Sequence, residues 1–216
     1  MNEHSFIIWF RQVTTQGATI NKHGKNTKYH LILEAAVKVF ARQGFYQSTI
    51  AQIAKEAGVA DGTIYLYFKN KDDILVQFFS YRTRQVFDRF QAEVAKAENS
   101  LDKLRNLIRR HLMEFQRDRD MAVVYLVETH RNSRLAESQI REMSQMYQDL
   151  ISEIVELGQQ EGRIRKDLYV GLVKRFILGA VDEVINTWLH SEKQYDLVSM
   201  ADPLVDLFIR GIGTAD

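Results

Sequence analysis

Apolar residues recur at steps of three and four along most of this chain, which is the spacing of one face of an α-helix. The pattern predicts a first helix that starts near residue 28 and ends at Gly44. Its apolar stripe consists of Ile32, Ala35, Ala36, Val39 and Phe40. Residues 1–26 lack this period and contain several Thr, Asn and Gly residues, so we expect a flexible arm there.

The next segment carries the start and end signals of two short helices. Thr49 and Gln52 stand three residues apart, so each side chain can bind a free backbone amide of the other where a second helix begins. Gly58 tolerates the left-handed backbone that often ends a helix. A third helix is predicted over residues 61–68. Two short helices joined by a glycine turn and supported by the first helix form a helix-turn-helix unit.

Beyond residue 70 the periodic segments become longer. We expect six further helices, at about residues 75–98, 101–116, 121–129, 136–160, 170–190 and 204–212. Pro203 is the only proline, and long stretches are rich in residues that favour helix. The predicted fold class is therefore all-α with about nine helices. An N-terminal helix-turn-helix domain is expected over 27–72, with 49–68 as its recognition unit, and a ligand-binding and dimerisation domain over 73–216.

Composition excludes several classes of protein. The 216 residues are 45% hydrophobic and 26% charged, an ordinary balance for a globular chain. No cysteine is present, which rules out disulfides, thiolate nucleophiles and cysteine–zinc sites and agrees with a reducing cytoplasm. Neither an export signal nor a run of about 20 apolar residues appears, so we expect a cytoplasmic protein without a membrane partner.

Charge is distributed unevenly along the chain. Residues 1–70 hold eight basic and four acidic side chains, a net charge of +4, which leaves −3 for the remainder because the whole chain carries +1. The N-terminal third is the part that a polyanion would prefer. An uneven surface without function is the alternative interpretation of this difference.

The third helix carries the groups that a DNA-reading helix needs in the major groove. Gly62 allows close approach of the backbone, because it has no side chain. Thr63, Tyr65 and Tyr67 offer hydroxyl groups that can bind phosphates or bases, and Lys69 and Lys71 place positive charge beside them. This pattern predicts double-stranded DNA as the partner.

The segment from Thr49 to Lys71 resembles the helix-turn-helix of the TetR family of bacterial regulators. The features that carry the resemblance are a threonine-led helix ending Ala-Gly-Val, then Gly-Thr-Ile-Tyr-Leu-Tyr-Phe and an Asn-Lys pair. The resemblance implies a transcriptional repressor that binds a palindromic operator as a homodimer. It also implies the DNA contacts: phosphates at Thr49, Thr63, Tyr67 and Lys71, and base edges at Asp61, Gly62, Tyr65 and Leu66.

Two of these residues have another interpretation. Many relatives carry serine at the position of Ala60 and a basic or polar residue at that of Asp61. The Asp61 carboxylate either accepts from a cytosine amino group or caps the helix, and the cap is the preferred interpretation. The ring of Tyr65 can pack on the first helix and leave only its hydroxyl group exposed.

The last two helices are the expected dimer surface. Small residues there allow close helix packing and large apolar residues provide area. The candidates are Val173, Ile177, Gly179, Ala180, Trp188, Leu204, Phe208 and Ile212. Ordinary intramolecular core is the alternative for some of them. In the family that the chain resembles, the last two helices form a four-helix bundle across the two-fold axis.

Large side chains on the middle helices form a candidate cavity for a small-molecule effector. They are Phe79, Phe87, Phe90, Phe115, Tyr125 and Tyr147. A simple aromatic core would show the same spacing. The family resemblance favours a cavity, because these regulators release DNA when an effector enters the middle helices and moves the fourth helix.

A narrower resemblance points to the effector. Residues 60–71, 179–183, Trp188 and 193–197 look like those of FadR-type members, which repress fatty-acid degradation genes and respond to long-chain acyl-coenzyme A. An apolar tunnel would hold the acyl chain, and arginines at its mouth would meet the phosphates. The candidate arginines are Arg105, Arg109, Arg131 and Arg134. Ion pairs with Asp102, Glu114 or Glu128 are the alternative for each.

Other functions remain as alternatives. One is a TetR-type regulator of an efflux or other operon that responds to an unrelated hydrophobic ligand, and another is an architectural DNA-binding protein without an effector. An enzyme is not expected, because the six histidines lack metal-ligand spacing and neither a phosphate-binding glycine loop nor a nucleophile elbow occurs. Glu128 and His130 are a weak lead for acid–base chemistry. We expect no metal and no cofactor.

Overall fold

The computed structural model describes residues 22–130, 137–193 and 195–212, and in these ranges the fold is all-α, as predicted. The reading head consists of α2 (Lys22–Gln43), α3 (Ile50–Ala57), α4 (Asp61–Ile64) and the turns up to residue 70. The remaining α-helices are α5 (Lys71–Ala95), α6 (Ser100–Arg117), α7 (Arg119–His130), α8 (Glu137–Gln160), α9 (Val170–His190) and α10 (Ala201–Ile212). A 3-10 helix, η1 (Leu197–Met200), precedes α10.

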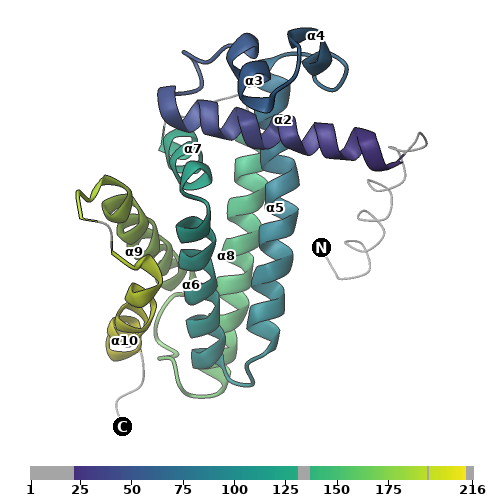
Figure 1. The fold of residues 1–216 in the computed structure, drawn as a ribbon. Coiled ribbons are helices and arrows are strands. Elements are labelled where there is room, and N and C mark those ends of the chain that lie inside the picture. Colours follow the sequence, from purple (N-terminus) through teal and green to yellow (C-terminus); the bar gives the residue numbers. More distant parts are fainter. Residues whose placement is uncertain (1–21, 131–136, 194, 213–216) are drawn as a thin grey trace.

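Three long helices, α5, α6 and α8, pack side by side and form the body of the molecule (Figure 1). Helices α9 and α10 cover one side of this body through α8 and α6. At one end α2 crosses the long helices, packs on α5 and α7, and carries α3 and α4 on its far side (Figure 1). Among the helices of the reading head, α2 is therefore the one that packs on the body.

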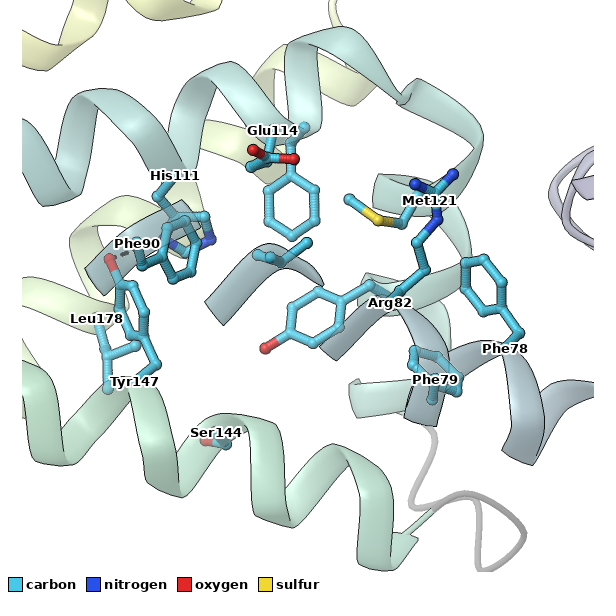
Figure 2. A pocket seen from close by; sticks show the side chains of 13 residues that line it. Phe78, Phe79, Arg82, Phe90, His111, Glu114, Met121, Ser144, Tyr147 and Leu178 are labelled. Atoms are coloured by element: carbon cyan, nitrogen blue, oxygen red, sulfur yellow. Dashed lines mark hydrogen bonds between the residues drawn. The ribbon is translucent and has the colours of Figure 1, made fainter. Parts of the chain in front are cut away.

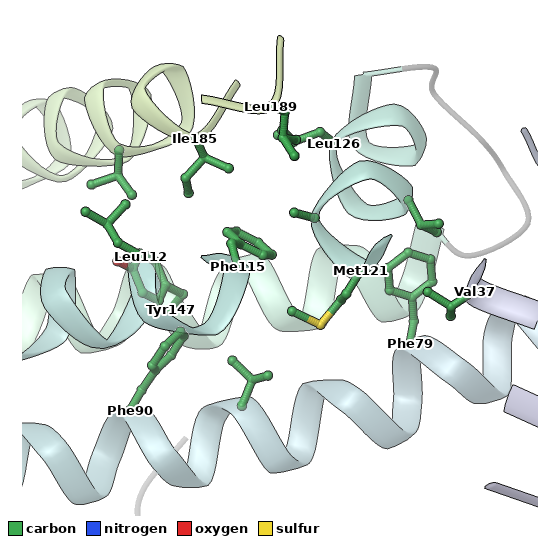
Figure 3. Close-up of a cluster of buried hydrophobic side chains, with 14 of the residues drawn as sticks. Val37, Phe79, Phe90, Leu112, Phe115, Met121, Leu126, Tyr147, Ile185 and Leu189 are labelled. Atoms are coloured by element: carbon green, nitrogen blue, oxygen red, sulfur yellow. The ribbon is translucent and has the colours of Figure 1, made fainter. Parts of the chain in front are cut away.

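One buried apolar cluster runs from the reading head into the body. Val37 of α2 lies beside Phe79 of α5 at one end of the cluster, while Ile185 and Leu189 of α9 lie on the side away from α5 (Figure 3). Because side chains from one helix touch several others, displacing one wall of this core disturbs the packing of its neighbours. A change inside the body therefore has a physical route to α2.

The local signals for the helix-turn-helix are confirmed. The Thr49 hydroxyl accepts a hydrogen bond from the Gln52 backbone N–H at 3.3 Å, and the Gln52 side chain accepts one from the Thr49 backbone N–H at 2.8 Å. Gly58 ends α3 with a φ of +66°, in the left-handed region that the sequence predicted. Asn70 caps the next helix by accepting from the Asp73 N–H.

Several helix boundaries differ from the prediction: α5 begins at Lys71 rather than near residue 75, α10 begins at Ala201 rather than near residue 204, and two boundaries in the reading head also differ. Helix α2 begins at Lys22 rather than near residue 28, so the prediction of a flexible arm was wrong for residues 22–26, while residues 1–21 lie outside the described range. Apolar periodicity marks only the part of a helix that packs on the core. Helix α4 ends at Ile64 rather than Phe68, and turns follow it up to Tyr67. Thr63, Tyr65 and Tyr67 are weak helix formers.

Candidate DNA-reading surface and effector cavity

The outer side of α4 and its following turn is the exposed part of the helix-turn-helix. Tyr65 and Leu66 are 59% and 79% exposed, and Asp61 and Gly62 are exposed beside them. Ile64 and Phe68 point the other way and are buried, as the sequence predicted. This arrangement leaves all four base-edge candidates accessible on one short segment.

The alternative interpretations of Asp61 and Tyr65 both differ from what the structure shows. Ala60 is the N-cap of α4 and no side chain caps this helix, so the prediction that Asp61 is the cap was wrong. Asp61 is the first helical residue, where its charge favours the positive end of the helix dipole. Tyr65 is 59% exposed as a residue, so the interpretation in which only its hydroxyl group reaches solvent was wrong. Contacts of both residues with bases remain predictions.

The phosphate candidates differ in how free their side chains are. Thr49 is exposed and Thr63 and Tyr67 are half-buried. The Thr49 hydroxyl is already engaged in the capping box with Gln52, although a hydroxyl oxygen has a second lone pair for another partner. Thr49 precedes α4 in the sequence, Thr63 lies within it and Tyr67 follows it. Their contacts with phosphates stay predictions.

Lys71 has a structural role that the sequence did not reveal. Its ammonium donates hydrogen bonds to the backbone carbonyls of Phe45, Tyr46 and Ser48, at 2.7, 3.2 and 2.8 Å. Three carbonyls match the three N–H groups of an ammonium, so no donor is left for a phosphate in this arrangement. Lys71 therefore ties the first turn of α5 to the loop that leads into α3.

A cavity lies inside the body, between α5, α6, α7, α8 and α9, and its walls are mainly aromatic (Figure 2). Its free volume is about 50 Å³. A water molecule needs about 10–15 Å³ on this measure, so the cavity has room for a few waters but not for a large ligand. Entry of an effector therefore requires the surrounding helices and side chains to move apart.

Five of the six predicted aromatic residues line this cavity. They are Phe79, Phe90, Phe115, Tyr125 and Tyr147. Phe87 does not line it and packs half-buried against the core. The lining also contains residues that the sequence analysis missed: Phe78, Arg82, Val86, His111, Glu114, Met121, Ser144 and Leu178. Helical spacing from the predicted members would have found Arg82, Val86 and His111, which stand three or four residues from Phe79, Phe90 or Phe115.

One end of the cavity holds a buried polar pair, His111 and Tyr147 (Figure 2). The Nδ1 atom of His111 lies 2.8 Å from the Tyr147 hydroxyl oxygen. Burial lowers the pKa of His111 to about 4, against an opposing effect of the Glu114 charge, and burial raises the pKa of Tyr147. Both side chains are therefore neutral near pH 7, and this end of the cavity suits the apolar part of a ligand.

Glu114, also in the cavity wall, is an ionised group held by two arginines. Burial raises the pKa of Glu114, but hydrogen bonds and charges from Arg89 and Arg110 outweigh burial and lower it overall. Arg89 donates to both carboxylate oxygens, at 2.6 and 2.7 Å, and Arg110 approaches to 2.5 Å. The negative charge is thus compensated within the protein and does not require a cationic ligand.

Two of the four predicted arginines, Arg105 and Arg109, are described, and neither lines the cavity. Arg109 donates to Asp202 at 2.6 Å and Arg105 to Asp206 at 3.2 Å, so both join α6 to α10. Their position at the mouth of a ligand tunnel stays a prediction. The alternative interpretation, that these arginines form ion pairs, is confirmed. Their partners lie on α10, however, 93 and 101 residues away along the chain, and are not the acidic residues that were predicted. Arg131 and Arg134 lie outside the described residues.

Helices α9 and α10 use two different faces. Six of the eight predicted dimer residues are at most 8% exposed within one chain and belong to its core: Val173, Ile177, Trp188, Leu204, Phe208 and Ile212. Only Gly179 and Ala180 retain accessible surface. The outer face instead exposes Leu172, Phe176 and Leu207, at 60%, 55% and 69%. We call these three residues the outer apolar face.

Two family models cover most of the chain. Residues 32–78 match the model of bacterial regulatory proteins of the tetR family, and residues 79–211 match the model of the YsiA-like protein C-terminal region. The first model spans the helix-turn-helix, and the second spans the last two helices and all of the cavity lining except Phe78. Fold and surface together define a DNA-binding transcriptional regulator.

Individual relatives agree with these models. The fatty acid metabolism regulator protein of Bacillus subtilis (strain 168) is 36% identical over 87% of this chain and 97% of its own length. The fatty acid degradation regulator FadR from Bacillus halodurans superposes with a TM-score of 0.80 at 32% identity, covering 89% of this chain and 98% of that one. The transcriptional regulator FadR from Bacillus subtilis in complex with stearoyl-CoA has a TM-score of 0.78 at 36% identity, covering 85% and 99%.

The chain belongs to the TetR family of transcriptional regulators. Proteins of this family bind operator DNA as dimers. None of the helices in the described ranges combines the length and apolar character needed to cross a bilayer. Nor do three metal-ligating side chains gather anywhere in those ranges.

Proposed function

We propose that this protein is a dimeric repressor of fatty-acid metabolism genes that leaves its operator when a long-chain acyl-coenzyme A enters the cavity. The aromatic cavity inside the body carries the proposal, because it offers an apolar enclosure between the helices that support the reading head. The similarity to a FadR structure in complex with stearoyl-CoA supports this choice of ligand. The regulator acts in the cytoplasm, and we assign it no catalytic activity.

The small size of the cavity supports release by ligand binding. An acyl chain cannot enter about 50 Å³ without separating the walls. Two of those walls, α5 and α7, also pack against α2. A ligand that binds only the expanded state shifts the population toward it. The expanded state would place the two reading heads wrongly for the operator. The ligand then lowers the affinity for DNA, and bound DNA lowers the affinity for the ligand by the same factor.

The proposed organisation assigns DNA binding to residues 27–72 and effector binding and dimerisation to residues 73–216. Base contacts come from Tyr65 and Leu66, with Gly62 and Asp61 beside them. Thr49, Thr63 and Tyr67 bind phosphates. The outer apolar face, with Gly179 and Ala180, joins two copies of the chain. Exposed apolar side chains of this size on adjacent helices are typical of a protein interface.

The test is an operator-release assay against acyl-coenzyme A of increasing chain length. An operator is first selected from a pool of random DNA duplexes, and its complex with the protein is then titrated with octanoyl- to stearoyl-coenzyme A. Release should strengthen with chain length, because each buried methylene contributes about 0.8 kcal/mol. Phe115→Ala should alter this dependence, whereas Arg84→Gln, at an exposed position of α5 that does not line the cavity, should not. Release by an unrelated amphiphile alone would favour an efflux-type regulator and refute the acyl ligand.

A further inference from the structure

Arg82 of α5 connects the cavity to the reading head directly. Its side chain is part of the cavity wall. The same guanidinium donates from one terminal nitrogen to both carboxylate oxygens of Glu34 on α2, at 2.9 and 3.1 Å. That nitrogen also donates to Asp118, between α6 and α7, at 2.8 Å. One side chain thus joins the ligand cavity, the reading head and the start of α7.

Asp118 extends this connection to a second residue of the cavity wall. One of its carboxylate oxygens binds Arg82, and the other accepts a hydrogen bond from the backbone N–H of Met121 at 3.0 Å. Met121 lines the cavity beside Arg82 (Figure 2). Displacing either side chain therefore disturbs the carboxylate that both share.

Arg82 also has a donor to spare. Its Nε–H is buried and has no acceptor among the described residues. A buried donor without a partner costs free energy, which an incoming acceptor would recover. Arg82 and Met121 lie at the end of the cavity opposite His111 and Tyr147 (Figure 2). Arg82 is half-buried, whereas His111 and Tyr147 are buried, so the Arg82 end is nearer to solvent.

We propose that Arg82 senses the effector: an acceptor oxygen of the ligand takes the free Nε–H, and the guanidinium shifts and loosens its ion pair with Glu34. The alkyl chain then points toward His111 and Tyr147, and the polar end of the ligand lies at the solvent side. This inference rests on the proposed acyl ligand and adds the residue that recognises its carbonyl group and transmits binding to α2.

A matched pair of ligands tests the recognition step. Stearoyl-coenzyme A carries a thioester carbonyl, and S-octadecyl-coenzyme A is the thioether that lacks this oxygen. In the wild type, stearoyl-coenzyme A should raise the Kd for the operator by a factor of order 10–100, as is typical of allosteric coupling, and the thioether should raise it far less. Stearate, which offers a carboxylate, separates a response to any acceptor oxygen from a response to the thioester.

Three variants test the transmission step. Arg82→Gln should reduce the effect of stearoyl-coenzyme A on the operator Kd to below about threefold and make the two ligands equivalent. Glu34→Gln keeps Arg82 in place, so it should retain ligand binding, measured by calorimetry, while losing the same coupling. The double variant should show the same coupling as either single variant, because both substitutions remove the same interaction. Arg84→Gln, at an exposed position on the same helix, should behave as the wild type does.

The inference is overturned if Arg82→Gln and Glu34→Gln keep the wild-type coupling, or if the thioether releases the wild type as well as the thioester does. Failure of the acyl proposal gives a different result, since stearoyl-coenzyme A would then not bind the wild type at all. In that case, hydrogen exchange measured without ligand tests whether the Arg82–Glu34 ion pair couples α5 to α2. Both variants, but not Arg84→Gln, should accelerate exchange of the α2 amides, and unchanged exchange refutes the relay.

Discussion

The ammonium of Lys71 lies 2.7 Å from the carbonyl oxygen of Phe45 and 4.5 Å from the centre of the Phe45 ring. A single lysine at the start of α5 thus fixes the loop that carries Thr49 into the DNA-reading unit. Its ammonium group stabilises the reading head and positions α3, and it is not free to bind a polyanion.

Lys71→Ala should therefore weaken operator binding without changing its dependence on salt. Each phosphate contact contributes about 0.9 to the slope of log K against log salt concentration, and an internally bonded lysine contributes none. Lys69→Ala is the matched control, because Lys69 is exposed two residues away and should lower the slope by about one unit. Binding isotherms from 50 to 200 mM salt measure both. A reduced slope for Lys71→Ala would return that lysine to the phosphate clamp.

Tyr67→Phe should weaken binding to every DNA sequence equally. Loss of one phosphate hydrogen bond costs about 1 kcal/mol, or roughly fivefold in Kd. Tyr65→Phe, in contrast, should weaken the operator more than a scrambled duplex, because Tyr65 is a proposed base contact. Fluorescence anisotropy on both duplexes separates the two roles. Equal losses for Tyr65→Phe on operator and scrambled DNA would remove this hydroxyl from base recognition.

Phe176→Glu and Leu207→Glu should each convert the dimer into monomers and reduce operator affinity. Both side chains belong to the outer apolar face, where a buried carboxylate without a partner would be costly. Sedimentation velocity measures the mass, and circular dichroism checks that the helices remain. Met113→Glu, at a 39% exposed position on α6, serves as control and should stay dimeric. Dimers that survive both substitutions would place the interface elsewhere.

Acid should destabilise the protein through His111. Its pKa is about 4 in the folded chain and 6.5 in the reference state, so the unfolded chain binds the proton more readily. The stabilising contribution is complete above pH 6.5 and disappears as the pH falls toward 4. The loss amounts to about 3 kcal/mol in the free energy of unfolding.

Urea denaturation of wild type and His111→Gln at pH 7 and pH 4 measures this effect. The wild type should lose about 3 kcal/mol more than the variant between these pH values. Glu114 also loses stabilisation on acidification, because its pKa is lowered in the fold, but it contributes to both proteins. Equal pH dependence of the two proteins would mean that His111 is protonated without penalty.

The sequence by itself determined the order of the helices and the local structure of the DNA-reading unit. The capping box of Thr49 and Gln52 and the left-handed Gly58 involve residues that are neighbours along the chain, so their geometry depends on local chemistry. The apolar period also identified most of the aromatic residues of the cavity, because a helical stripe marks what is buried.

Only the tertiary structure decided which partner each buried or charged side chain meets. Trp188 and Phe208 are as apolar as an interface requires, yet the packing of α9 and α10 turns them into the core of one chain and leaves Phe176 outside. The role of Arg82 could not be predicted from the sequence, because its partners Glu34 and Asp118 lie 48 and 36 residues away along the chain. Periodicity tells which face of a helix is covered, whereas the covering residue is set by how distant helices pack.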